Sequence, residues 1–229
     1  MSDPDDAEFA ARRLAARARL DAIDDAGASD PYRRGWFEAV YATAGDDPAQ
    51  IPWADLAAHP LLAAWLRDVP TPPPGSRALD VGCGLGDNAA ALAARGWQTT
   101  GFDLSALAAR WAAARFPRLS FLAADLFKPP ADWQGAFDLV HECYTLQALP
   151  DAARAEAMAN IASFVRRGGT LLVIARARAG AGTIAGPPWP LTRTEILAFE
   201  QHGLRAENIE ELADPTDGKP HWRATFRRS

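Results

Sequence analysis

The chain is organised around one segment, Leu79-Asp80-Val81-Gly82-Cys83-Gly84-Leu85-Gly86-Asp87-Asn88-Ala89. Residues 77–81 predict a short buried strand, and the alanine-rich stretch from Asp87 predicts a helix. Three alternating glycines join them, and glycine allows strained turns and close approach of a ligand to the backbone. The first N–H groups of a helix point at such a ligand. The segment therefore predicts a strand, a tight turn and a helix N-terminus that hold a nucleotide-like molecule.

An acidic residue at the end of the next apolar run supports this interpretation. Residues 99–102 end at Asp103, 21 residues after Gly82. In a βαβ unit, an acid at this distance accepts hydrogen bonds from ribose hydroxyls. The alternative is an ordinary turn in a structural αβ unit. An NAD-dependent dehydrogenase is disfavoured, because a dinucleotide fingerprint reads G-x-G-x-x-G and this turn reads G-x-G-x-G.

The G-x-G-x-G order, with Asp80 two residues ahead of the first glycine, resembles the first motif of class I S-adenosylmethionine-dependent methyltransferases. The resemblance continues through Asp103, residues 124–126 and residues 137–140. It implies an α/β fold with a Rossmann-like seven-stranded sheet, mostly parallel with an antiparallel last strand, and helices on both faces. It implies S-adenosylmethionine (SAM) as the cofactor, bound by Asp80, Gly82, Cys83, Gly84, Gly86, Asn88, Asp103, Leu104, Asp125 and Leu126. No metal is expected.

The section before the glycine turn predicts an N-terminal helical cap. A proline cluster in residues 70–74, followed by Gly75, is typical of a boundary, so we expect a cap or lid in residues 1–75 and a SAM-binding core in residues 76–229. Within the cap, residues 5–27 predict an amphipathic helix.

Aromatic residues are dense in this cap. A Trp and Tyr segment followed by Pro-Trp is similar to the cap of the thiopurine S-methyltransferase-like small-molecule enzymes. The resemblance implies that Trp53 closes over the cofactor and that Trp36 and Tyr41 contact the substrate. Plain packing in a small core of their own is the alternative.

The segment after the predicted fourth strand is the expected source of acceptor contacts, because ligands of open α/β sheets gather at the carboxyl ends of strands. His141 is a candidate general base, since the ordinary pKa of histidine lies near neutrality, although a satisfied core histidine is equally compatible. Glu142 and Tyr144 are the other candidate catalytic residues, and Tyr144 is also a candidate substrate contact. The thiopurine enzymes have an Asp-Arg pair here, whereas this chain has Glu142-Cys143. The attacking atom therefore stays open among sulfur, nitrogen, oxygen and halide.

Other core segments carry local signals. The 186–190 segment, Gly-Pro-Pro-Trp-Pro, is either a surface loop or a wall of the acceptor pocket formed by Trp189. Ser105 is placed to cap a helix, and Thr192 with Glu195 predicts a capping box. We expect a helix from Asp151 that Gly168-Gly169 ends, a strand over residues 170–175, and two final strands over residues 205–212 and 221–228.

Composition bounds the function. A net charge of −5 argues against a nucleic-acid surface, which needs a basic stripe. Two cysteines indicate no disulfide framework. No apolar run reaches the length of a membrane span, and the acidic N-terminus is unlike a secretory signal. We therefore expect a cytoplasmic protein. The expected function is methyl transfer to a small molecule. A non-catalytic SAM-binding module and a protein side-chain methyltransferase are the alternatives, and the oligomeric state is open.

Overall fold

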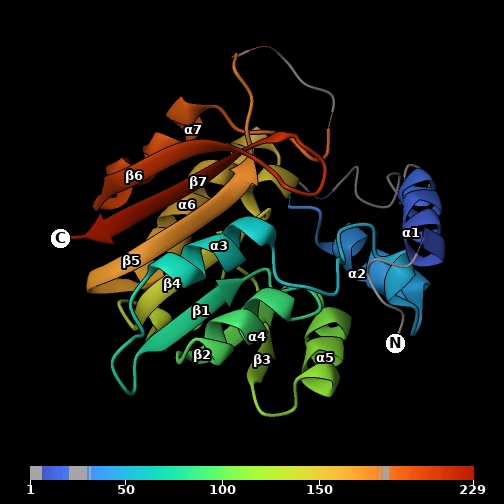
Figure 1. The fold of residues 1–229 in the computed structure, drawn as a ribbon, viewed down its shortest axis with the longest axis horizontal. Coiled ribbons are helices and arrows are strands. Elements are labelled where there is room, and N and C mark those ends of the chain that lie inside the picture. The colour runs from blue at the N-terminus through green and yellow to red at the C-terminus, as the bar shows by residue number, and fades with distance from the viewer. Residues whose placement is uncertain (1–6, 21–29, 31, 181, 183–185) are drawn as a thin grey trace.

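A seven-stranded sheet forms the centre of the computed structural model, which describes residues 7–20, 30, 32–180, 182 and 186–229 (Figure 1). The strand order is β3-β2-β1-β4-β5-β7-β6. The strands are β1 (Arg77–Val81), β2 (Gln98–Asp103), β3 (Ser120–Ala123), β4 (Phe137–Cys143), β5 (Val165–Arg176), β6 (Leu204–Ala213) and β7 (Pro220–Arg228). The α-helices are α1 (Ala7–Leu20), α2 (Arg34–Ala44), α3 (Pro60–Asp68), α4 (Asp87–Ala94), α5 (Ala106–Arg115), α6 (Asp151–Phe164) and α7 (Arg193–Leu197). Short 3-10 helices are η2 (Pro48–Gln50), η3 (Ala131–Trp133), η4 (Leu146–Ala148) and η5 (Ala198–His202).

The strand directions confirm the predicted sheet. Neighbours from β3 to β5 pair in parallel, whereas β7 runs antiparallel to both β5 and β6. The carboxyl ends of β1, β4, β5 and β6 therefore meet at one edge of the sheet, and the amino end of β7 lies at the same edge.

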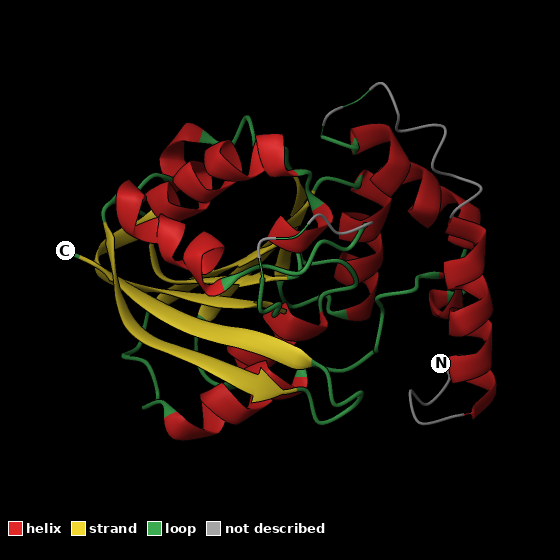
Figure 2. Ribbon diagram, turned by 90° about the horizontal axis from the view of Figure 1, so that it is seen from above, coloured by secondary structure: helices red, strands yellow, loops and turns green. Residues whose placement is uncertain are grey.

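Helices cover both faces of the sheet, as predicted (Figure 2). One face packs against α3 and α4, with Leu62 and Leu92 meeting Leu139 and Leu172. The other face packs against α6 and η5, where Ile161 joins alternate residues of the same strands. Because successive side chains of a strand point to opposite faces, two buried faces explain why β4 and β5 are apolar almost throughout.

The predicted end of α6 is wrong. The helix ends at Phe164, and β5 begins at Val165 and runs through both glycines, so neither of them stops the helix. Val165 pairs with Phe137, and the register shifts before Leu139. A Cβ on Gly169 would lie 2.9–3.0 Å from three backbone oxygens, so this irregular part of the ladder leaves no room for a side chain.

The predicted helix caps are confirmed. The Ser105 side chain accepts a hydrogen bond from the Ala108 N–H, and Thr192 and Glu195 form a capping box. The predicted N-terminal helix corresponds to α1, and its predicted end near Gly27 lies outside the described residues. Among the helices that the structure describes, none combines the length and the apolar character that crossing a membrane requires.

Candidate functional site

The turn between β1 and α4 has a shape that only glycine fits well. Gly82, Gly84 and Gly86 all have positive φ angles, of 63°, 52° and 88°. A Cβ on Gly82 would lie 2.4 Å from Thr145 Oγ1, and a Cβ on Gly86 would lie 2.8 Å from the Phe121 ring. The three positive φ angles thus favour glycine at every position of G-x-G-x-G, and space also requires it at Gly82 and Gly86.

Asp103 fixes this turn from the end of β2. Its carboxylate accepts hydrogen bonds from the N–H groups of Gly84 and Ser105, each at 2.9 Å. Burial raises the pKa of Asp103 to about 6, although these two hydrogen bonds lower it. The glycine turn and the acid predicted to act with it thus meet in the hydrogen bond from Gly84 to Asp103, and Asp103 also lines the adjoining cavity.

A cavity of about 570 Å³ adjoins the turn, within the usual range for small-molecule sites. It lies between the turn, the N-terminal section and the segment after β4. Of the predicted cofactor contacts, nine line it, namely Gly82, Cys83, Gly84, Asn88, Asp103, Leu104, Asp125, Leu126 and Trp53. Asp80 and Gly86 are not among the lining residues. The structure therefore brings most of the predicted cofactor residues to one cavity.

Aromatic residues of the predicted cap line the same cavity. Trp36, Tyr41 and Trp53 are all lining residues, and the Trp53 Nε1–H donates to Tyr41 Oη at 3.0 Å. Trp36 and Tyr41 are buried, and the Trp36 and Trp53 ring centroids lie 5.8 Å apart. These residues therefore pack against one another and also line the cavity. Their role in cofactor and substrate binding stays a prediction.

His141 lies beneath the site. Its Nδ1 is 2.7 Å from Asp80 Oδ1, and the two residues are register partners on β4 and β1. Both are fully buried, and neither lines the cavity. Within the described part of the chain, Asp80 Oδ2 and His141 Nε2 have no hydrogen-bond partner. This position favours a role in fixing Asp80 behind the turn, and general-base catalysis by His141 stays a prediction.

Glu142 is a buried acid on the same strand. Its Oε1 accepts a hydrogen bond from the Leu146 N–H at 3.0 Å, while Oε2 has no partner among the residues described. Burial raises the pKa of Glu142 to about 7, so the carboxyl holds its proton up to neutral pH. Glu142 is not a lining residue, and its role also stays a prediction.

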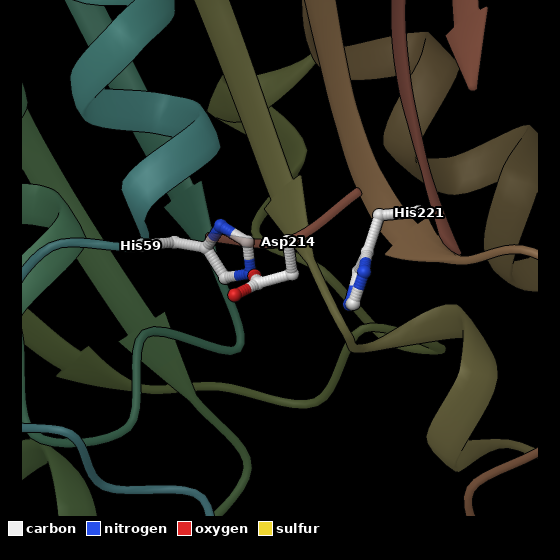
Figure 3. A group of neighbouring side chains, drawn as sticks. All are labelled: His59, Asp214 and His221. Atoms are coloured by element: carbon white, nitrogen blue, oxygen red, sulfur yellow. The ribbon is translucent and has the colours of Figure 1, made fainter. Parts of the chain in front are cut away.

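Tyr144 stands at the centre of a polar cluster. Its hydroxyl lies 2.7 Å from His59 Nε2 and 2.7 Å from His221 Nε2. His59 Nε2 is also 3.3 Å from Asp214 Oδ2. In Figure 3 the His59 ring lies against the Asp214 carboxylate, and the His221 ring lies to one side of them. Tyr144, His59 and Asp214 line the cavity.

Sequence reasoning missed three members of this cluster. Asp214 follows β6 and His221 is the second residue of β7, so the strand directions bring both to the edge where Tyr144 follows β4. The predicted antiparallel last strand was a usable signal for His221. His59 comes from the cap side, and no local pattern connects it with a residue 85 positions away.

Arg34 was also missed. Its Nε donates to Asp125 Oδ2 at 3.0 Å, and its guanidinium lies 4.2 Å from the centre of the Tyr32 ring. Asp125, a predicted cofactor contact, is therefore paired with the first residue of α2. Arg34 and Tyr32 line the cavity as well.

Trp189 does not line the cavity, but residues 186–188 of the same loop do. The backbone N–H of Trp189 donates to the Gln147 carbonyl at 2.7 Å, and the Arg33 guanidinium lies 5.9 Å from the centre of the Trp189 ring. The loop thus borders the site through its backbone and prolines. Contact between Trp189 and a substrate stays a prediction.

This arrangement of turn, acid and cavity agrees with a sequence comparison. Residues 78–169 match a family described as "Methyltransferase domain". The matched methyltransferase segment begins in β1 and includes the glycine turn, Asp103, Asp125 and Tyr144, but it excludes the cap and the last two strands.

Curated relatives match the chain over similar stretches. The chain is 32% identical over 133 residues to a ubiquinone biosynthesis O-methyltransferase of Albidiferax ferrireducens, covering 49% of this chain and 52% of that protein. It is 37% identical over 103 residues to a trans-aconitate 2-methyltransferase of Deinococcus radiodurans, covering 44% of this chain and 38% of that protein. The chain thus spans about half the length, or less, of the curated relatives it matches.

A solved structure shares most of the fold. The 1,6-didemethyltoxoflavin-N1-methyltransferase of Burkholderia thailandensis, solved with 1,6-didemethyltoxoflavin and S-adenosylhomocysteine bound, superposes with a TM-score of 0.67 at 21% identity. The match covers 86% of this chain and 87% of that one. The fold is that of the class I methyltransferases, and the thiopurine-like subgroup is not among the features that these comparisons support.

Proposed function

We propose that this protein is a SAM-dependent methyltransferase that acts on a small molecule. The observation that carries the proposal is the hydrogen bond from the Gly84 N–H to Asp103, two residues that line a cavity of about 570 Å³. Gly82 and Gly84 line this cavity, so their backbone faces the space where a ligand would lie. The methyltransferase relatives and the matched domain support the same reaction.

The residues present fit SAM. In this proposal Gly82 and Gly84 offer backbone groups to the amino-acid part of SAM, and Asp103 offers carboxylate oxygens to the ribose hydroxyls. Asp125 would accept a hydrogen bond from the adenine amino group, as the resemblance to class I methyltransferases implies. The bound cofactor would supply an activated sulfonium methyl group. The protein then aligns the acceptor with that methyl and excludes water, effects worth up to about 7–11 kcal/mol of barrier. Trp36, Tyr41 and Trp53 give the cavity an aromatic wall that suits a cation.

A small-molecule acceptor fits the aromatic-walled cavity better than a protein side chain. The two curated relatives are named for ubiquinone biosynthesis and for trans-aconitate, which supports a small organic acceptor. The Glu142-Cys143 pair stands where the thiopurine enzymes have Asp-Arg, so a thiopurine-like sulfur acceptor has no support beyond the cap aromatics.

Calorimetric titration of SAM, S-adenosylhomocysteine and NAD tests the proposal. We expect micromolar binding of the first two, no binding of NAD, and at least a tenfold loss for Asp103→Ala, because the ribose contacts and the Gly84 hydrogen bond disappear together. Asp68→Ala removes an exposed acid at the end of α3 and serves as the matched control. NAD binding, or SAM binding indifferent to Asp103, would overturn the proposal. Release of S-adenosylhomocysteine with any acceptor separates an enzyme from a non-catalytic SAM-binding module.

A further inference from the structure

The hydrogen bonds around His59 fix where its proton lies. Its Nδ1 accepts the Leu61 N–H at 3.2 Å as the N-terminal cap of α3, so Nδ1 carries a lone pair. Burial lowers the pKa of His59 to about 4, so the ring is neutral at physiological pH and its single proton is on Nε2. His59 Nε2–H therefore donates toward Tyr144 Oη, with Asp214 Oδ2 as a second acceptor.

His221 has the opposite tautomer. Its Nδ1 lies 2.9 Å from the Lys219 carbonyl oxygen, which only accepts hydrogen bonds, so Nδ1 carries the proton. His221 Nε2 is then a lone pair 2.7 Å from Tyr144 Oη. The Tyr144 hydroxyl consequently donates to His221 and accepts from His59. One chain of hydrogen bonds runs from His59 through Tyr144 to His221.

This polarity bears on whether the cluster binds a metal ion. The ligand atoms of His59, Asp214 and His221 all lie within 4.8 Å of one another, a spacing that a metal ion also allows. A metal needs the lone pair of each imidazole nitrogen that it binds. His59 has its proton on the nitrogen that faces the cluster, because its other nitrogen caps α3. The hydrogen bonds thus favour proton transfer over metal binding.

We infer that Tyr144 and His221 accept the proton of a hydroxyl or amine acceptor during methyl transfer, while His59 and Asp214 position Tyr144. The inference rests on the proposed function and narrows it to protic acceptors. Tyr144 is the member that meets the acceptor, and His221 acts through it. A thiolate or halide acceptor has no such proton and needs no such chain.

The step balances without a further reactant. The bond between sulfur and the methyl carbon breaks, and the bond between the acceptor atom and that carbon forms. The acceptor proton passes to Tyr144 Oη as the Tyr144 proton passes to His221 Nε2. The positive charge lost at sulfur appears on the His221 imidazolium, beside the Asp214 carboxylate and with its Nδ1–H held by the Lys219 carbonyl.

Two features of Tyr144 support a relay role. Burial raises the pKa of its phenol well above the usual value, so Tyr144 stays protonated and passes a proton on instead of holding a charge. Its backbone has a φ of 69°, which is strained for a side-chain-bearing residue and is kept only where surrounding contacts over-determine it. Its two hydrogen bonds to imidazoles are such contacts.

The test uses the full chain saturated with SAM and a panel of probes: phenol, catechol and benzylamine as protic acceptors, and 4-nitrothiophenol and iodide as acceptors that need no base. We expect S-adenosylhomocysteine release with a protic probe. For Tyr144→Phe and His221→Gln, we expect kcat to fall about 100-fold with KM and SAM affinity within about twofold, the usual share of general-base catalysis. His202→Gln, outside the cavity lining, is the matched control and keeps wild-type rates.

A second measurement is independent of turnover. In side-chain ¹⁵N spectra of histidine-labelled protein, we expect the signal of a ring protonated on Nε2 to disappear in His59→Gln. We expect the signal of a ring protonated on Nδ1 to disappear in His221→Gln. These signals report the relay even in a variant with altered rates.

Three outcomes overturn the inference while SAM binding still holds. They are turnover of the thiol or iodide alone, equal kcat in Tyr144→Phe and wild type, and one equivalent of zinc held by wild type but not by His59→Gln. A panel without any turnover also overturns it for these protic acceptors. Failure of SAM to bind overturns the proposed function instead, so the two failures are distinguishable.

Discussion

Replacing Glu142 by glutamine should change how the stability of the protein depends on pH. Glu142 is fully buried, and burial raises its pKa from the usual 4.5 to about 7. The native state therefore holds this proton more tightly than the unfolded chain does, and stability falls as pH rises through this window. Once the carboxyl is fully ionised the cost is about 3 kcal/mol, of which about 2.5 kcal/mol develops between pH 5 and pH 8.

Glutamine removes the charge and keeps an oxygen to accept the Leu146 N–H. We expect the free energy of unfolding of Glu142→Gln, relative to wild type, to rise by about 2.5 kcal/mol from pH 5 to pH 8 in urea titrations. Asp103, whose pKa burial also raises, is present in both proteins and its contribution cancels. Glu211→Gln, an exposed carboxyl on β6, is the control. A difference that stays flat between pH 5 and pH 8 would refute the reasoning.

Further predictions concern the turn and its supports. Gly82→Ala should lower the free energy of unfolding by about 1–3 kcal/mol through backbone strain and collision with Thr145, and it should abolish SAM binding in calorimetry. Unchanged binding would show that the turn can accommodate the added methyl group. Ser105→Ala should lower the free energy of unfolding by about 1 kcal/mol, because α5 loses its cap; no change in urea titration would contradict this. Arg115→Leu should lower the free energy of unfolding by about 3–5 kcal/mol, because it leaves Asp87 without its bidentate partner. A thermal midpoint equal to that of wild type would contradict this loss.

The elements with strong local signals were predictable from sequence. The strand, glycine turn and helix over residues 77–94, the cap at Ser105 and the capping box at Thr192 were all found, because each depends on residues within a few positions. The end of α6 was mispredicted, since pairing of Val165 with Phe137 in β4 outweighs the helix-stopping tendency of Gly168 and Gly169. That pairing is a tertiary contact with no local sequence signal.

The residues of the candidate site also divide into those that local sequence signals predict and those that only the tertiary structure brings together. Asp103 and the glycines were placed by spacing, and the structure joins them in a hydrogen bond. His59 and Asp214 were not predicted, because their relation to Tyr144 depends on how the cap section and the β6–β7 turn approach one edge of the sheet. Arg34 pairs with Asp125 across 91 residues, a distance at which periodicity carries no information.

The boundary of the matched domain explains why the reaction is easier to infer than the acceptor. Residues 78–169 contain the turn, Asp103, Asp125 and Tyr144, which are the groups expected to meet the cofactor and the transferable methyl. Other lining residues come from outside that range: Trp36, Trp53 and His59 precede it in the sequence, and Asp214 follows it. His221, which acts through Tyr144, also lies outside it. We therefore expect acceptor choice to depend on these outer segments as well as on Tyr144, so that proteins with the same cofactor motif can differ in the atom they methylate.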